Sequence, residues 1–253
     1  MTTNSGFAYA QARLQARFAG LPAVDEWQRL AAARTLSAFL EEARSGTLRV
    51  WVKGFSGQSD VHDLEAGVRI LFREAVEDVA GWVPNPWRDS VLWIRWLILL
   101  PVIDHLARKG RLPTWVNRDP FLSGLAGDDG ALDPGRLRLA GAGALAQGFQ
   151  DPAAAWKREW SRLQPPCKRV FRDHMRALAV LLENHVSAFR EARPETTWVL
   201  RRELRKRLAL LFHCRLLEPA SSIIFLILTA LDLERLRAEL VGRALFGAGE
   251  AAT

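Results

Sequence analysis

The sequence is poor in the residues that usually build metal sites, disulfide frameworks and hydrolytic centres. It has two cysteines and five histidines among 253 residues. Cys167 and Cys214 lie far apart in the sequence, whereas disulfide frameworks and zinc sites use clustered pairs. The cysteine content therefore predicts a reducing compartment and no structural zinc site.

No segment predicts a secretory signal or a membrane span. The N-terminus lacks a basic start followed by an apolar run, and it lacks a small-residue cleavage site. The apolar stretch 91–103 contains Arg95, and the stretch 223–231 is far shorter than the roughly 20 residues that a spanning helix needs. Both stretches are expected to be buried helices of a cytoplasmic protein.

Motifs for catalysis or cofactor binding are also lacking. The stretch 141–143 (Gly-Ala-Gly) has neither the Lys nor the preceding strand of a phosphate-binding loop. His174 and His185 are three helical turns apart, roughly 16 Å along a helix, and cannot share a metal ion. The carboxylates within 128–133 do not have the spacing of a calcium loop. We expect no catalytic residue, cofactor or metal, so a helical enzyme is the least supported class.

The chain has the composition of a folded protein with a basic surface. It is 49% hydrophobic and 25% charged, close to the average for soluble globular proteins. Ten tryptophans accompany a single tyrosine, which fits either core filling or an interaction surface. The net charge of +7 permits contact with nucleic acid, anionic lipid or an acidic protein partner, and selects none of them.

Apolar periodicity predicts helices along most of the chain and no sheet. The predicted fold class is therefore all-α, a bundle of amphipathic helices. Asp60 is expected to cap a helix over 60–79, whose apolar residues recur three and four positions apart. Residues 47–52 alternate and are expected to form a short extended segment. The other helices are expected over 8–18, 25–45 with a break near Arg34, 87–109 with an interruption at Pro101, 152–163, 165–189, 195–217 and 221–245.

The stretch 111–150 differs in composition from the rest of the chain. It is rich in glycine and proline and is expected to be a linker or a set of short helices, one of them over 135–146. It would separate an N-terminal helical subdomain, 1–110, from a C-terminal one, 151–247. The tail 248–253 is expected to be frayed.

The strongest charge feature is the basic run 201–207. Its cations spread around a helix, while Leu204 and Leu208 turn inward. A nucleic-acid site would add aromatic residues or a reading helix, but only Trp198 is close. We therefore favour a solvated face or an acidic protein partner over nucleic acid. The candidate partner-binding residues are Arg201, Arg202, Arg205, Lys206, Arg235 and Arg237.

Both ends of the chain resemble a known family. The stretch 9–17 (YAQARLQAR) resembles the first helix of the central-stalk component of V-type and archaeal-type ATPases, the C/d family, whose eukaryotic members are also called AC39 proteins. The stretch 223–237 (IIFLILTALDLERLR), followed by Phe246-Gly247, resembles that family's last long helix. The resemblance covers roughly 7–50 and 216–247. Family members are usually longer, with three similar helical subdomains, so this chain would be a shortened form.

The resemblance implies a non-catalytic, cytoplasmic subunit that is membrane-associated only through its complex. Its helical subdomains would form a funnel, which would link the membrane rotor ring to the central shaft and transmit torque for ion or proton transport. Two other classes remain open from the sequence. They are a helical adaptor unrelated to ATPases and a basic helical nucleic-acid-binding protein.

Overall fold

A computed structural model describes residues 4–109, 116, 119–125, 127, 131–148 and 150–247. Most of these residues are helical, with no β-strand among them, so the predicted all-α class is confirmed. No helix in these ranges combines the length and apolar character that crossing a membrane requires. The tail 248–253 and the carboxylates Asp128 and Asp129 lie outside the described residues.

The helices follow the predicted order. The N-terminal group consists of the 3-10 turn η1 (Asn4–Phe7), α1 (Ala8–Ala19), α2 (Val24–Leu30), α3 (Leu36–Ser45) and α4 (Arg49–Val52). The middle group consists of α5 (Val61–Trp82), α6 (Asn85–Leu92), the 3-10 helix η2 (Trp93–Leu99), α7 (Leu100–Lys109), α8 (Pro120–Ser123), α9 (Pro134–Leu139), α10 (Gly143–Gln147) and α11 (Pro152–Leu163). The C-terminal group consists of α12 (Arg169–Glu191), the 3-10 turn η4 (Pro194–Thr196), α13 (Thr197–Cys214) and α14 (Pro219–Phe246).

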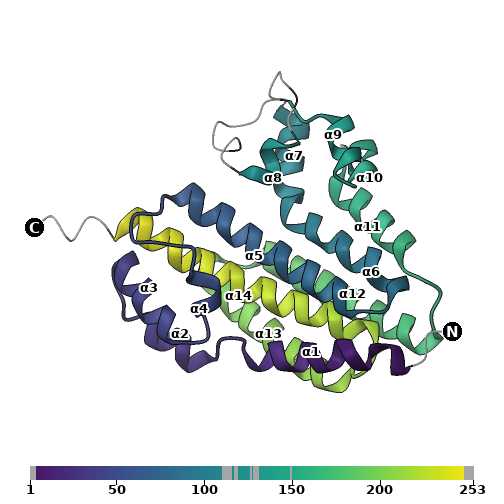
Figure 1. Cartoon of the computed structure of the whole chain (residues 1–253), viewed down its shortest axis with the longest axis horizontal. Helices are drawn as coiled ribbons and strands as arrows, with labels where there is room; N and C mark the ends of the chain where they lie inside the picture. Colours follow the sequence, from purple (N-terminus) through teal and green to yellow (C-terminus); the bar gives the residue numbers. More distant parts are fainter. Residues whose placement is uncertain are drawn as a thin grey trace, which may run out of the picture.

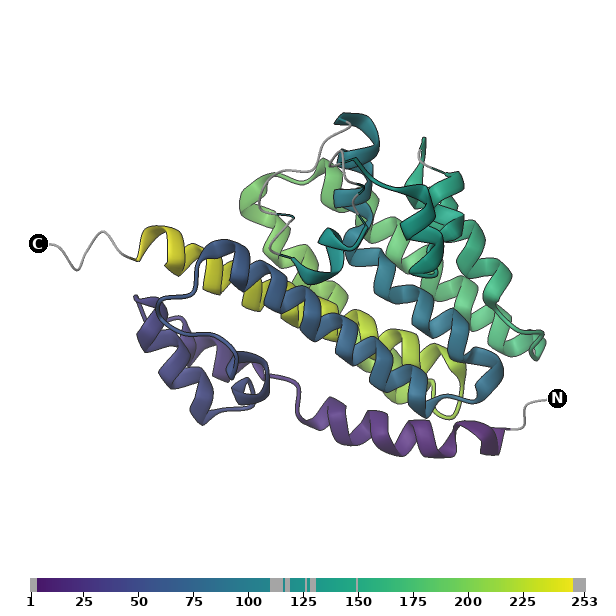
Figure 2. The ribbon, with the colours of Figure 1, turned by 45° about the horizontal axis from the view of Figure 1, so that its top comes forward.

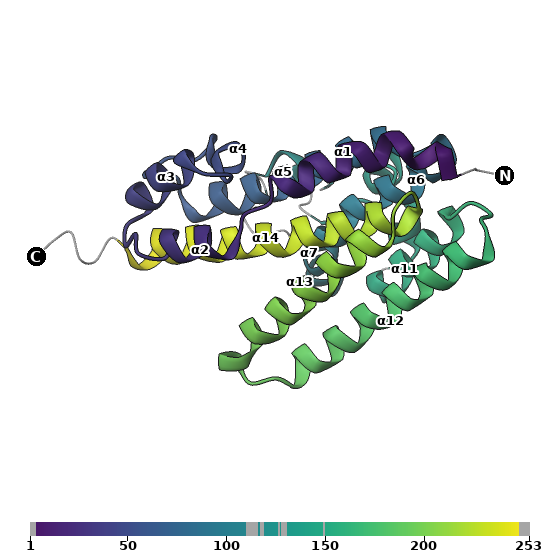
Figure 3. The same ribbon diagram turned by 90° about the horizontal axis from the view of Figure 1, so that it is seen from below.

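Helix α14 is the centre of the molecule. Its apolar run begins directly after Pro219, and the first eight residues, Pro219–Leu226, are all buried. Figure 3 shows α5 and α1 along one side of α14 and α13 along the other. A helix that is apolar all round its circumference must be covered on every side, and this requirement organises the main core around α14.

Helix α5 forms where its pattern predicts. The Asp60 side chain accepts hydrogen bonds from the backbone amides of His62 (2.8 Å) and Asp63 (2.9 Å), which caps the helix as expected. The helix runs to Trp82, three residues past the predicted end at 79. Its buried stripe faces α14.

Residues 47 and 48 form a turn and 49–52 form the helix α4, so the predicted extended segment is wrong. Leu48 and Val52 are fully buried, whereas Val50 between them is half exposed. Positions i and i+4 share one face both in a helix and in a strand, so the sequence pattern could not separate the two. The carboxylate of Glu26 accepts the Thr47 backbone amide (2.8 Å) and thereby fixes the preceding turn.

The helix predicted over 87–109 is divided into three parts. The interruption is the 3-10 helix η2, which ends before Pro101, and Pro101 itself lies in the first turn of α7. A proline is tolerated there because its missing amide has no helical partner to lose. The tighter turn also redirects Leu97, which was expected to be buried and is 42% exposed.

The Gly/Pro-rich stretch contributes to a second apolar core. That core includes Trp93, Trp96, Leu137, Leu145 and Ala155, so it takes residues from both sides of the predicted linker. Figures 1 and 2 show its helices, α7 to α10, on the side of α5 away from α1. The helix predicted over 135–146 is the pair α9 and α10, which is broken at Gly141 with a φ of 82°. The subdomain limits at 110 and 151 stay predictions.

Candidate functional site

The six predicted partner-binding cations lie on two helices that pack together. Arg201, Arg202, Arg205 and Lys206 are on α13, and Arg235 and Arg237 are on α14. Arg201 and Arg237 share the carboxylate of Glu234 (4.0 and 3.4 Å), and Arg205 pairs with Asp232 (2.9 Å).

Arg205 is engaged deep in the helix interface. Its guanidinium donates to both carboxylate oxygens of Asp232 (2.9 and 3.0 Å) and to the Pro22 carbonyl oxygen (3.0 Å). The Asp232 side chain is 3% exposed. Burial raises the pKa of the Asp232 carboxyl, and the hydrogen bonds and charge of Arg205 act in the opposite direction. Arg205 thus joins α13, α14 and the α1–α2 connection.

Arg237 is also used within the chain. It forms an ion pair with Glu65 of α5, and Arg69, one turn further along α5, binds the buried carboxylate of Asp119 (2.8 Å). Arg237 pairs in addition with Glu234 on its own helix (3.4 Å). These pairs tie α14, through α5, to the segment that begins α8.

The other four cations take part in ring contacts or in exposed ion pairs. Arg201 lies over the Phe189 ring (5.0 Å), Arg202 over the Trp198 ring (4.7 Å), and Arg235 over the Trp27 ring (4.5 Å). Lys206 pairs with Glu203 (3.1 Å). Cations in such contacts keep their charge and stay available at the surface, so partner binding by these residues remains a prediction.

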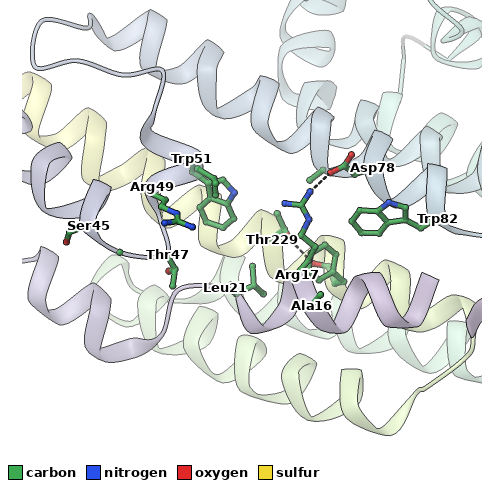
Figure 4. A pocket seen from close by; sticks show the side chains of 15 residues that line it. Ala16, Arg17, Leu21, Ser45, Thr47, Arg49, Trp51, Asp78, Trp82 and Thr229 are labelled. Carbon is green, nitrogen blue, oxygen red and sulfur yellow. Dashed lines mark hydrogen bonds and ion pairs between the residues drawn. The ribbon is translucent and has the colours of Figure 1, made fainter. Parts of the chain in front are cut away.

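A groove forms where the two ends of the chain meet, and we call it the α1–α5 groove. It has a volume of about 510 Å³ and runs over α14, between α1 and α5, with the turn before α4 at one end (Figure 4). Its principal side chains are Arg17, Leu21, Arg49, Trp51, Asp78, Trp82 and Thr229. The sequence pattern does not indicate this groove, because its residues come from four separate segments.

Positive charge and indole rings dominate the α1–α5 groove. The Arg17 guanidinium pairs with Asp78 (3.0 Å) and lies 5.8 Å from the centre of the Trp82 ring. Arg13 lies over the same ring at 5.4 Å. Arg49 at the opposite end has no ion-pair partner among the residues that the structure describes. Because Asp78 balances only one of the two guanidinium groups that line the groove, Arg17 and Arg49, the groove suits an acidic, partly apolar binding partner.

A second polar cluster holds the corner between α13 and α14. The Nδ1 atom of His174 lies 2.6 Å from a carboxylate oxygen of Glu218, and its Nε2 atom lies 2.7 Å from the Arg215 guanidinium. Since the guanidinium can only donate, Nδ1 carries the proton and donates to Glu218. Next to it, Leu217 has a φ of 60°, which few residues other than glycine adopt. Its amide donates to the Gln11 side chain of α1 (3.1 Å).

Replacing His174 with Ala is expected to lower the free energy of unfolding by about 1–3 kcal/mol, because the buried Glu218 carboxylate loses a hydrogen-bond donor. Urea unfolding followed by circular dichroism measures the change. His185→Ala on the same helix is the matched control, since His185 contacts the Phe189 ring (6.0 Å) and has no hydrogen bond to another residue that the structure describes. An equal loss of unfolding free energy in both variants would show that the His174–Glu218 contact does not stabilise the fold.

The described part of the chain holds no group of three or more His, Cys, Asp or Glu residues arranged for a metal ion. Both cysteines are free thiols, and burial raises the pKa of Cys167. No family model, curated protein or solved structure matches this chain.

Proposed function

We propose that this chain is a non-catalytic central-stalk subunit of a V/A-type ATPase, of the C/d class and in shortened form. It would link the membrane rotor ring to the soluble shaft and transmit torque. The observation that carries this proposal is the packing of the two family-like ends against each other. Helix α1 lies on α14, and the Arg243 guanidinium near the end of α14 donates to the Ala33 carbonyl oxygen (2.8 Å).

Each of the two terminal motifs is common by itself, and together they support the family resemblance more strongly because they form one structural unit. The N-terminal stretch supplies α1, and the C-terminal stretch supplies the helix on which α1 lies. The Gln11–Leu217 hydrogen bond and the contact of Arg205 with Pro22 fix the same pairing.

The mechanical character of the molecule also supports the proposal. Helix α14 has 28 residues and α5 has 22, which correspond to about 42 and 33 Å of rigid rod. They pack side by side through buried apolar stripes and are tied by the Arg237–Glu65 pair. Torque transmission requires such a stiff body, since close-packed interiors transmit strain.

Affinity purification tests the proposal. A tag on the full chain, with native extraction in mild detergent, is expected to recover the catalytic and rotor subunits of an ATPase. Recovery of none of them would contradict the proposal. A stable monomer would then favour a helical adaptor, and binding to duplex or single strands that weakens steeply with salt would favour a nucleic-acid-binding protein.

Two triple charge-reversal variants test the predicted partner-binding cations. Arg201→Glu, Arg202→Glu and Lys206→Glu together are expected to reduce the recovered subunits several-fold, because an acidic partner would be repelled. The matched control reverses Arg169, Arg172 and Arg176, which are exposed cations of α12. Equal recovery with both triple variants would mean that the α13 cations do not bind the partner.

A further inference from the structure

A second groove opens between α11 and α12, and we call it the α11–α12 groove. Its volume is about 550 Å³, and α14 forms its floor, with η2 and the start of α7 at the side. This volume falls in the range of about 300–1,000 Å³ that small-molecule sites occupy. The principal apolar side chains are Trp156, Trp160, Met175, Leu182, Val186 and Ile227.

The tryptophan wall of this groove presents no polar atom that lacks a partner. The Trp156 and Trp160 rings are stacked, with centroids 5.6 Å apart and planes 17° apart. The Trp156 indole N–H donates to the Trp93 carbonyl oxygen (3.2 Å), and the Trp160 indole N–H donates to the Ser90 carbonyl oxygen (3.1 Å). Both rings therefore offer hydrocarbon contact to the groove.

The apolar stripe of α12 is only partly covered. Met175 and Leu178 are buried, whereas Val186, two to three turns further along, is 46% exposed. Leu97 on the other side of the groove is 42% exposed. Figure 3 shows α12 and α13 as a hairpin whose closed end points away from α14. The distal part of the stripe is thus left without a neighbour in the described part of the chain.

Polar groups in the groove follow a single line along α12. Glu183, Ser187 and Arg190 stand at positions i, i+4 and i+7, so they share one edge of the helix. Glu183 pairs with Lys157 of α11. No residue in the described ranges forms an ion pair with Arg190. The groove therefore has an apolar body and one uncompensated positive charge at its distal end.

We propose that the α11–α12 groove binds a single-chain fatty acid, with the alkyl chain between α11 and α12 and the carboxylate at Arg190. The 12 residue steps from Leu178 to Arg190 span about 18 Å, part of which the Arg190 side chain covers because helical side chains tilt toward the N-terminus. One acyl chain is about 15 Å long, half of the roughly 30 Å hydrocarbon thickness of a bilayer. The buried end of the groove, at Met175 and Leu178, receives the methyl end.

The shape of the groove favours an alkyl chain over a partner helix. The Lys157–Glu183 ion pair ties α11 to α12. An alkyl chain fits beside this pair, whereas a helix, about 10 Å across, requires the two helices to move apart. This inference is independent of the ATPase proposal, because it concerns a ligand of the isolated chain.

Calorimetric titration of the full chain with octanoate, decanoate and dodecanoate tests the proposal. Each added pair of methylenes is expected to lower Kd about tenfold, because about 0.8 kcal/mol accompanies each buried methylene. A bromine-labelled dodecanoate should also quench tryptophan fluorescence, and Trp160→Phe should reduce that quenching. Absence of dodecanoate binding up to its solubility limit overturns the proposal.

Two variants locate the ligand. Ala179→Phe fills the groove and is expected to raise Kd for dodecanoate at least tenfold. Val180→Phe, its neighbour on the exposed face of α12, should leave Kd unchanged. Circular dichroism verifies the fold of both variants. Equal effects of the two substitutions overturn the proposed location. A dimer that Ala179→Phe disrupts, without dodecanoate binding, identifies a second copy of the chain as the occupant instead.

Arg190→Gln examines the carboxylate contact without filling the groove. Kd for dodecanoate is expected to rise about three- to fivefold, the range of a partly exposed ion pair. Kd for dodecanol should not change, because the alcohol carries no charge. Equal changes for the acid and the alcohol overturn the role of Arg190.

Discussion

Replacing Arg205 with Ala is expected to lower the free energy of unfolding by about 3–5 kcal/mol. The substitution leaves the Asp232 carboxylate buried in α14 without its two guanidinium hydrogen bonds, and an unpaired buried charge carries a cost of that size. The contact with the Pro22 carbonyl oxygen is lost as well. For a chain of this length the midpoint of thermal unfolding should fall by about 10 °C.

The loss of unfolding free energy in Arg205→Ala should be larger at higher pH. Burial raises the pKa of the Asp232 carboxyl, while Arg205 lowers it, so the variant's carboxyl has a still higher pKa in the folded protein. When the pKa of a carboxyl is higher in the folded protein than in the unfolded chain, the group stabilises the fold at pH values below its unfolded pKa, about 3.9. This contribution is lost as the pH rises through the folded pKa. The difference in unfolding free energy between wild type and Arg205→Ala should therefore be smaller at pH 5 than at pH 8.

Urea unfolding at both pH values measures this difference. Arg201→Ala is the matched control on the same helix, since Arg201 reaches Glu234 only at 4.0 Å and both side chains are well exposed. It should change the free energy of unfolding by less than about 1 kcal/mol. A loss in Arg205→Ala no larger than in this control, or one that grows toward pH 5, would contradict the assignment.

The helices of this protein were largely predictable, because their determinants are local. Asp60 and Asp151 each cap a helix within three residues of their own position. The stripe of α5 repeats every three to four residues and is buried as expected. Short segments were less predictable. In 47–52 two periodicities coincide, and near Pro101 the chain breaks where a 3-10 turn forms rather than at the proline itself.

The role of the basic run 201–207 depended on contacts that no local pattern contains. Arg205 and Arg202 are both arginines of this basic run, and the sequence pattern does not distinguish their roles. In the structure, Arg205 pairs with a residue 27 positions away, whereas Arg202 lies over the ring of Trp198. The α1–α5 groove poses the same difficulty. Trp51 and Trp82 line one groove only because α5 packs on α14 while α4 packs on α3, which also contacts α14, and their spacing in the sequence does not indicate it.

Trp96→Ala is expected to have the second large effect, and to show how the two apolar cores are coupled. The Trp96 side chain is fully buried in the second core, 5.2 Å from the Phe121 ring. Its removal should cost about 3–5 kcal/mol in that core. Native-state hydrogen exchange should then show faster exchange in α7, α9 and α10, while α5 and α14 keep their protection.

The matched variant is Trp87→Ala, because Trp87 is equally buried but belongs to the main core, beside the Phe7 ring (6.3 Å). It should accelerate exchange in α5 and α14 as well. If Trp96→Ala instead accelerates hydrogen exchange in all helices together, the two cores form one cooperative unit. In that case the tryptophan pair of α11, which packs against both cores, is what couples them. Faster exchange confined to the helices of the second core would place the boundary of a separate folding unit near Trp93, about 17 residues before the predicted limit at 110.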